Sequence, residues 1–249
     1  MPTVLITGCS SGFGLETAKL FLDKGWKVVA TMRHPKPDIL PASDSLTILP
    51  LDVTDRTSIA TAVQQAGEID VVVNNAGFGA AVPIELIEPE TARNLFETNT
   101  LGTLAMIQAV LPQFRERRSG VIVNVTSSAT LKPLPLISTY RASKAAVNAL
   151  SESLAVEVEP FGVRVHIVLP GRSPETQFGN NAIPHLRGLD NPDYKPLIEG
   201  MIANFREDSG PVTHAGDVAE AVWRAATDPD APLMIPAGKD AEQWMGEAS

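Results

Sequence analysis

The stretch Thr3-Val4-Leu5-Ile6-Thr7-Gly8-Cys9-Ser10-Ser11-Gly12-Phe13-Gly14 begins with an apolar run that stops at the first of three closely spaced glycines. A short, uninterrupted apolar run is typical of a strand that is buried on both faces of a parallel sheet. Apolar side chains then recur at helical spacing through Leu22. A glycine turn between a strand and a helix directs backbone N–H groups and the helix dipole at an anion, and glycine lets the anion come close. The stretch therefore predicts a parallel α/β sheet with a diphosphate site after its first strand.

The rest of the chain repeats this alternation of apolar strands and amphipathic helices. Further strands are predicted at Lys27–Met32, Leu46–Leu49, Ile69–Val73, Val121–Val125, Val163–Leu169 and Leu233–Ile235. Helices are predicted from residue 54 or 55 to 63, over roughly 88–116, from 140 to about 160, and over 217–226. Because right-handed crossovers place such helices on both faces of a sheet, we predict one doubly wound α/β domain over residues 1–249, with about seven parallel strands.

The composition excludes several classes of protein. The 249 residues are 44% hydrophobic and carry a net charge of -9, which fits a large core and argues against a nucleic-acid binder. Cys9 is the single cysteine, so we expect neither a disulfide framework nor a cysteine metal cage, and a reducing cytoplasm is the expected compartment. The N-terminus enters a strand directly and no run of ~18 apolar residues occurs, so neither a signal peptide nor a membrane span is expected.

Ligands of a doubly wound sheet bind beyond the carboxyl ends of its strands. The residues that follow predicted strands are Gly8–Gly14, Arg33, Asp52, Asn75–Gly77, Ser127 and Pro170–Gly171. The glycines are spaced Gly-x-x-x-Gly-x-Gly, which differs from the commoner dinucleotide fingerprint, and no Lys-Ser/Thr pair follows them as in a P-loop. We interpret the turn as a dinucleotide site; the alternative is a plain flexible turn.

The end of the second strand predicts which dinucleotide is bound. An NAD site usually has an acid there that binds the ribose 2′-hydroxyl, whereas this chain has Met32 and Arg33. A guanidinium pairs well with a 2′-phosphate, so NADP (as NADPH) is favoured and NAD remains an option. The alternative is that Arg33 is a solvated loop residue. Asp52 can accept a hydrogen bond from the adenine amino group, or it only begins the next helix.

The stretch Tyr140-Arg141-Ala142-Ser143-Lys144 opens a helical segment, which places Tyr140 and Lys144 on one face. An ammonium close to a phenol stabilises the phenolate and is expected to lower the pKa of the phenol. A phenol with a lowered pKa is a usable proton donor or acceptor. The alternative is a surface tyrosine beside a solvated lysine.

Five motifs occur here in one order: Thr7-Gly8-x-x-x-Gly12-x-Gly14, Asn74-Asn75-Ala76-Gly77, Ser127, Tyr140-x-x-x-Lys144 and Pro170-Gly171. In this order they resemble the motifs of the short-chain dehydrogenase/reductase family, and the resemblance covers essentially the whole chain. It implies a Rossmann-like fold and hydride transfer with a nicotinamide cofactor. Arg33 and the position of Ser127, thirteen residues before Tyr140, resemble the NADP-preferring carbonyl, steroid and retinol reductase-like members.

The resemblance implies four catalytic residues. Tyr140 would exchange a proton with the substrate oxygen, and Lys144 would lower the pKa of Tyr140 and bind the nicotinamide ribose. Ser127 would polarise the substrate carbonyl, although the hydroxyl residues on either side of it are alternatives. Asn99 would kink a helix and hold a water of the proton relay; otherwise it is only a polar residue within a helix.

The expected cofactor contacts come from the strand ends and the catalytic helix. They are Gly8, Ser10, Ser11, Gly12, Phe13, Gly14, Arg33, Asp52, Val53, Asn75, Ala76, Gly77, Tyr140, Lys144, Pro170, Gly171 and Ser173. The family usually has a threonine four residues after the last of these glycines, but here Thr176 lies five residues after it, so either Ser173 or Thr176 takes this role. We expect no metal, because His185 and His214 are predicted to be a loop residue and a helix-start residue.

Residues 172–212 form the predicted lid over the substrate. The spacing from Pro196 to Phe205 predicts an amphipathic helix whose apolar face closes over a hydrophobic substrate, or else only packs on the core. The apolar side chains of the segment are Phe178, Ile183, Leu186, Leu189, Tyr194, Leu197, Ile198, Met201, Ile202 and Phe205.

The sequence therefore predicts an NADP-dependent oxidoreductase that reduces an apolar ketone or aldehyde to an alcohol, or runs in reverse. One alternative is a non-catalytic NAD(P)-binding regulator on the same fold. Another is a nucleotide-sugar epimerase or dehydratase, which usually needs a larger C-terminal domain. Family members commonly associate through the helices near 90–116 and 140–160, so a homodimer or homotetramer is expected, with no nucleic-acid or membrane partner.

Overall fold

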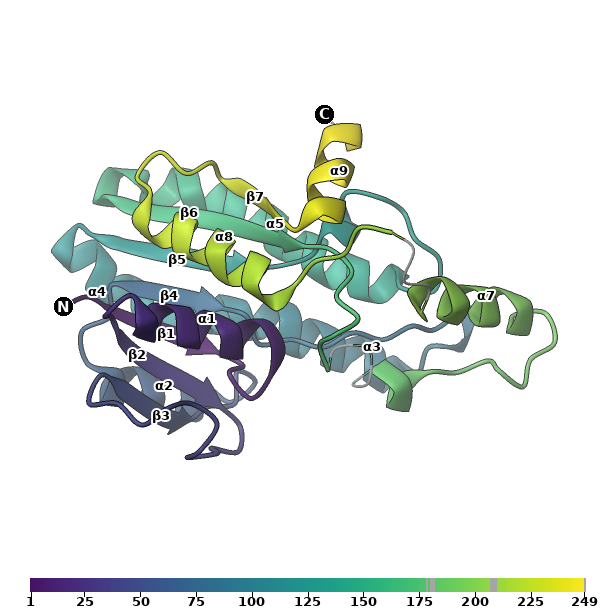
Figure 1. Ribbon diagram of the computed structural model, residues 1–249, viewed down its shortest axis with the longest axis horizontal. Helices are drawn as coiled ribbons and strands as arrows, with labels where there is room; N and C mark the ends of the chain where they lie inside the picture. The colour runs from purple at the N-terminus through teal and green to yellow at the C-terminus, as the bar shows by residue number, and fades with distance from the viewer. Residues whose placement is uncertain (178, 180–181, 207–209, 249) are drawn as a thin grey trace.

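The computed structural model describes residues 1–177, 179, 182–206 and 210–248 (Figure 1). Phe178, which the sequence assigns to the lid, lies outside the described residues. Within the described part of the chain, no helix is both long enough and apolar enough to cross a membrane.

One sheet of seven parallel strands forms the centre of the molecule, as the sequence predicts. The strands are β1 Thr3–Thr7, β2 Lys27–Met32, β3 Leu46–Pro50, β4 Val71–Asn74, β5 Gly120–Val125, β6 Val163–Pro170 and β7 Met234–Ala237. Their order is β3-β2-β1-β4-β5-β6-β7, so the direction in which the sheet grows reverses between β1 and β4. Ligands of doubly wound sheets bind at this reversal, beyond the carboxyl ends of the strands.

Helices cover both faces of the sheet (Figure 1). The longer ones are α1 Gly12–Asp23, α2 Arg56–Ala66, α3 Pro89–Phe96, α4 Gly102–Arg117, α5 Ser138–Val158, α7 Lys195–Arg206, α8 Ala215–Thr227 and α9 Lys239–Ala248. Short helical turns are η1 Ile84–Leu86, η2 Glu97–Leu101, η3 Ser128–Thr130, η4 Glu159–Phe161 and η5 Ile183–His185. The predicted lid helix is α7, which lies beyond the carboxyl ends of the strands (Figure 1).

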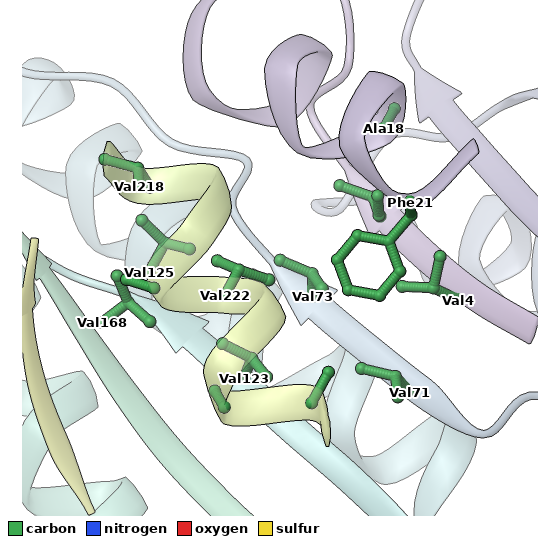
Figure 2. Packing of buried hydrophobic residues seen from close by; sticks show 14 of the residues in the cluster. Val4, Ala18, Phe21, Val71, Val73, Val123, Val125, Val168, Val218 and Val222 are labelled. Atoms are coloured by element: carbon green, nitrogen blue, oxygen red, sulfur yellow. The ribbon is translucent and has the colours of Figure 1, made fainter. Parts of the chain in front are cut away.

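The core consists of two apolar layers, one on each face of the sheet. Successive strand residues point to opposite faces, so Val4 packs in the layer under α1 and α8 while Leu5 packs in the layer under α2, α4 and α5. In the first layer, Phe21 of α1 and Val222 of α8 lie over the valines of β4 and β5 (Figure 2). This burial on both faces explains why the strands are uninterrupted apolar runs.

The helix expected over roughly 88–116 is divided into α3 and α4 by the π-helical turn η2, which contains Asn99, the residue at which the family resemblance implies a kink. One feature differs from the sequence prediction. The C-terminal helix α9 was not predicted at all. Its apolar residues Ala241, Trp244, Met245 and Ala248 stand at helical spacing, so the sequence carried a signal for this helix that the prediction did not use.

Candidate active site

Close backbone packing leaves no room for side chains at Gly8 and Gly14 in the turn after β1. Gly8 has a φ of +77°, and a Cβ on Gly14 would lie 2.5 Å from the carbonyl oxygen of Gly8. Asn75, at the end of β4, donates from Nδ2 to the carbonyl oxygen of Thr7 at 2.9 Å, and the backbone N–H of Ala76 donates to the Thr7 hydroxyl at 3.0 Å. The ends of β1 and β4 are thus locked together at the reversal point, and α1 begins at Gly12 within the turn without a side-chain cap, so its first backbone N–H groups can serve a diphosphate.

The adenosine end of the predicted site contains Arg33 and Asp52. Arg33 is exposed after β2. The Asp52 carboxylate accepts hydrogen bonds from the Thr54 backbone N–H at 2.9 Å and from the Thr54 hydroxyl at 2.7 Å. Burial raises the pKa of Asp52, but these hydrogen bonds and the charge of Arg33 outweigh it, so the pKa is lowered overall. Asp52 therefore stays ionised, and its bonds to Thr54 shape the turn before α2. The sequence analysis offered a role at the start of this helix as the alternative to an adenine contact. The adenine contact stays a prediction.

Asn99 fastens the loop after β4 to α5. Its Oδ1 accepts from the Phe78 backbone N–H, and its Nδ2 donates to the Phe78 carbonyl oxygen and to the Ser143 hydroxyl, each at 3.0 Å. A Cβ on Gly77 would lie 2.9 Å from Asn99 Oδ1 and 3.3 Å from Lys144 Nζ, so Asn99 and Lys144 border the same small space. The π-helical turn η2 places this side chain there, as the expected kink requires; a role in a proton relay stays a prediction.

Tyr140 lies in the first turn of α5 and is only 7% exposed. Its side chain is hydrogen-bonded to that of Ser127, which follows β5. Ser128 is also buried near the cavity, but Ser127 is the serine that meets the phenol. A buried hydrogen bond from Asn124 Nδ2 of β5 to Ser151 Oγ at 2.8 Å fixes α5 against the sheet and so fixes this pair.

The electrostatics of Tyr140 and Lys144 correct one expectation. Burial raises the pKa of Tyr140 to about 12, and the hydrogen bond with Ser127 offsets only part of this. The expected lowering of the pKa of Tyr140 by Lys144 is therefore wrong. Burial also lowers the pKa of Lys144 to about 8, and its Nζ donates to the Val125 carbonyl oxygen at 2.9 Å. The phenol keeps its proton at neutral pH, which suits a proton donor.

The loop after β6 contains a buried hydroxyl, that of Ser173, without a hydrogen-bond partner among the described residues. Ser173 is 6% exposed. Thr176 donates from its hydroxyl to the Ser173 carbonyl oxygen at 3.0 Å and packs against Gly12 of the glycine turn. A buried hydroxyl without a protein partner is usually satisfied by water or a ligand. Of the two candidates, Ser173 therefore has the geometry for a cofactor contact.

A cavity of about 1260 Å³ joins these parts. Ser127, Tyr140 and Ser173 supply polar groups to its wall, and Phe13 and Gly171 line the side next to the glycine turn. The apolar wall comes from the lid and neighbouring loops, through Leu134, Leu186, Leu189, Leu197, Met201 and Ile202. Gln243 and Trp244 of α9 complete it, and sequence reasoning missed both because α9 carries no motif.

The structure brings most predicted site residues to one edge of the sheet, while Arg33 and Asp52 lie at its adenosine end. His185 stacks near Phe78 at 5.2 Å between ring centroids, and exposed His214 meets Glu175 at 3.1 Å. Across the described ranges, no three His, Cys, Asp or Glu residues gather as a metal site would need.

Comparison with known proteins agrees with this geometry. A family model described as short chain dehydrogenase matches residues 2–185. A 3-ketodihydrosphingosine reductase of Bacteroides thetaiotaomicron is 39% identical over 195 residues, which are 77% of this chain and 71% of that protein. A short-chain dehydrogenase structure from Streptomyces avermitilis is 31% identical with a TM-score of 0.85, covering 99% of this chain and 92% of its own.

Two further solved structures carry a cofactor. A short chain dehydrogenase from Burkholderia cenocepacia in complex with NADP is 27% identical with a TM-score of 0.79, covering 98% of this chain and 91% of its own. A 3-ketoacyl-(acyl-carrier-protein) reductase from Brucella melitensis complexed with NADH is 28% identical with a TM-score of 0.80, covering 95% of this chain and 96% of its own.

Proposed function

This chain belongs to the short-chain dehydrogenase/reductase family and is an oxidoreductase acting on CH–OH groups, and from this premise we propose that it reduces a large apolar ketone or aldehyde with NADPH, or oxidises the corresponding alcohol. The observation that carries the proposal is the hydrogen-bonded pair of Tyr140 and Ser127 in the wall of an apolar cavity of about 1260 Å³. Two hydroxyl groups at the side of an apolar space can hold a single carbonyl oxygen while the rest of the substrate is buried.

The residues fit a nicotinamide dinucleotide. The glycine turn cannot carry side chains at Gly8 and Gly14 without collision, which leaves its backbone free to approach a diphosphate. The buried Ser173 hydroxyl, which lacks a partner among the described residues, is available to the nicotinamide end. When bound, the cofactor supplies or accepts the hydride.

The chain's own residues prepare the carbonyl. Ser127 donates a hydrogen bond to the carbonyl oxygen and polarises it. Tyr140, whose pKa is raised to about 12, holds a proton that it delivers to the same oxygen as negative charge develops there. A positive charge on Lys144 in the adjoining space favours phenolate once the proton has left. The apolar lid wall excludes water from this region.

NADP preference is proposed from Arg33, which is exposed at the end of β2 where an acid would favour NAD. Its guanidinium is free to turn toward a 2′-phosphate without leaving a buried position. Solved relatives carry NADP more often than NADH, which supports the proposal, but both cofactors occur among them, so the preference of this chain rests on Arg33 itself.

The substrate class is tested by following the loss of NADPH absorbance with ketones of increasing apolar size. We expect kcat/KM to rise from short aliphatic ketones to long-chain or polycyclic ones, because each buried methylene contributes about 0.8 kcal/mol. The matched control is a series of equal length that ends in a carboxylate. Tight NADPH binding without turnover of any carbonyl in the panel would instead favour the non-catalytic regulator.

We also propose that the protein acts in the cytoplasm as a homodimer or homotetramer. Leu101, just before α4, is 45% exposed and Val156 of α5 is 72% exposed, and buried positions in an oligomer would account for both. Sedimentation of the parent and of Val156→Glu tests this: the parent should sediment as two or four chains and the variant as one.

A further inference from the structure

The C-terminal helix α9 contributes to the apolar wall of the cavity and to the part beside the loop after β6. Gln243 and Trp244 line its apolar part, while Asp240, in the first turn of α9, lies against Gly171 at the end of β6. A Cβ on Gly171 would collide with the Asp240 carboxylate. The mechanism proposed above does not use this buried carboxylate.

The carboxylate of Asp240 is held by two hydrogen bonds. Oδ2 accepts from the backbone N–H of Arg172 at 2.6 Å, and Oδ1 lies 2.7 Å from the Thr213 hydroxyl, whose single proton is shared with the Ala237 carbonyl oxygen at the same distance. Asp240 is 5% exposed and Thr213 is fully buried. A carboxylate in such a place costs free energy unless it is hydrogen-bonded, so its position is tightly fixed by these two donors.

Thr213 extends the same network to the loop that follows β6. Its hydroxyl accepts from the Gly171 backbone N–H at 2.8 Å, and its backbone N–H donates to the Arg172 carbonyl oxygen at 2.8 Å. Asp240 and Thr213 together therefore satisfy the backbone of two consecutive loop residues. The next residue is Ser173, whose buried hydroxyl has no partner among the described residues and lines the cavity.

We propose that Asp240 is a positioning residue: through Thr213 and the backbone of Gly171 and Arg172 it fixes the loop that presents Ser173 to the nicotinamide end of the cofactor. The inference rests on the proposed function, because it needs a bound dinucleotide. It makes α9 a link between the substrate wall and the cofactor loop. Asp240 itself does not touch the reacting atoms.

The test compares Asp240→Asn with the parent by NADPH titration and by steady-state kinetics. Asparagine keeps the size of the side chain but replaces one acceptor with a donor, which would face the Arg172 N–H or the Thr213 hydroxyl. We expect the Kd and the KM for NADPH to rise about tenfold, with kcat at saturating NADPH within about twofold of the parent. Glu242→Gln removes an exposed carboxylate from the same helix and should leave all three values unchanged.

A second pair keeps the inference testable if Asp240→Asn does not fold. Thr213→Val removes the hydroxyl at nearly constant volume, and Thr213→Ser restores it. The Kd for NADPH should rise with valine and return close to the parent value with serine. A folded Asp240→Asn or Thr213→Val that binds NADPH like the parent overturns the inference, as does an equal rise in Glu242→Gln. A parent that binds NADPH but reduces no carbonyl refutes the proposed function and leaves this inference intact.

Discussion

The buried Nζ of Lys144 donates a hydrogen bond to the Val125 carbonyl oxygen, 2.9 Å away, at the end of β5. The residue thus spans the gap between α5 and the sheet beside the tyrosine of the same helix. Because burial lowers its pKa to about 8, this lysine carries its positive charge at a cost in free energy.

The first prediction concerns the free-energy cost of keeping Lys144 charged. The folded pKa of Lys144, about 8, lies below its ordinary value of 10.5, so between these values the unfolded chain binds more protons than the folded one. The free energy of unfolding should therefore rise with pH from about 8 to 10 in the parent, relative to Lys144→Met. Urea unfolding of both proteins without cofactor measures this difference, and parallel curves would contradict it.

The cofactor preference predicts an asymmetric effect of Arg33→Ala. Loss of a charge-assisted hydrogen bond to the 2′-phosphate should raise the Kd for NADPH about 10- to 100-fold, since such a bond contributes about 1.5–3 kcal/mol. The Kd for NADH should change little, because NADH has no 2′-phosphate. Titration with both cofactors checks this, and an equal loss for the two would refute the assignment of NADP. Arg33→Lys is the matched control and should retain part of the preference.

A third prediction concerns the core. Phe21 is fully buried and lies 5.1 Å, between ring centroids, from both Trp26 and Trp223. Phe21→Ala should lower the free energy of unfolding by about 3–5 kcal/mol, and Phe21→Leu by less, because leucine leaves a smaller cavity. Denaturant unfolding followed by tryptophan fluorescence reports the change. A loss below about 1 kcal/mol for alanine would mean that α1 and α8 do not share one core.

Acid stability should depend on His166. Burial lowers its pKa, with the charge of Arg164 in the same direction and the hydrogen bond with the Pro232 carbonyl oxygen opposing it. The folded protein therefore resists protonation of this ring, and stability should fall as the pH drops below the ordinary value of 6.5. His166→Gln should show a flatter decline between about pH 6.5 and 5. If the stability of His166→Gln falls as steeply with pH as that of the parent, a group other than His166 causes the acid sensitivity.

The sequence predicted the sheet well because each strand is buried on both faces and is therefore apolar without interruption. The positions of Gly8, Gly14 and Ser127 followed for the same reason, since motif residues that follow parallel strands meet at one edge of the sheet. Tyr140 is on α5, and its position was predicted from the family motif. The pKa of Tyr140 was predicted in the wrong direction. Its value depends on burial among apolar side chains that lie far from it in the chain, and the spacing to Lys144 says nothing about them.

Other features depend on contacts that no local pattern records. The role proposed for Asp240 depends on the backbone N–H of Arg172, which is 68 residues earlier in the chain and donates to its carboxylate. The proposal of Ser173 over Thr176 as the cofactor contact needed the observation that the Thr176 hydroxyl already donates to the Ser173 carbonyl oxygen. The hydrogen bonds of the Asn99 side chain to Phe78 and Ser143 are not revealed by helical periodicity, and the kink at Asn99 was expected only from the family resemblance.

Tyr140→Phe tests the central claim most directly, because it removes the phenolic hydroxyl and leaves the ring in its apolar surroundings. NADPH binding and carbonyl reduction are measured on the same preparation, with Tyr194→Phe, a tyrosine that meets Glu85 at the protein surface, as the matched control. The account predicts that Tyr140→Phe binds NADPH with a Kd within a few-fold of the parent and loses at least about 100-fold in kcat, while Tyr194→Phe keeps its activity. Reduction by Tyr140→Phe at close to the parent rate would contradict the account.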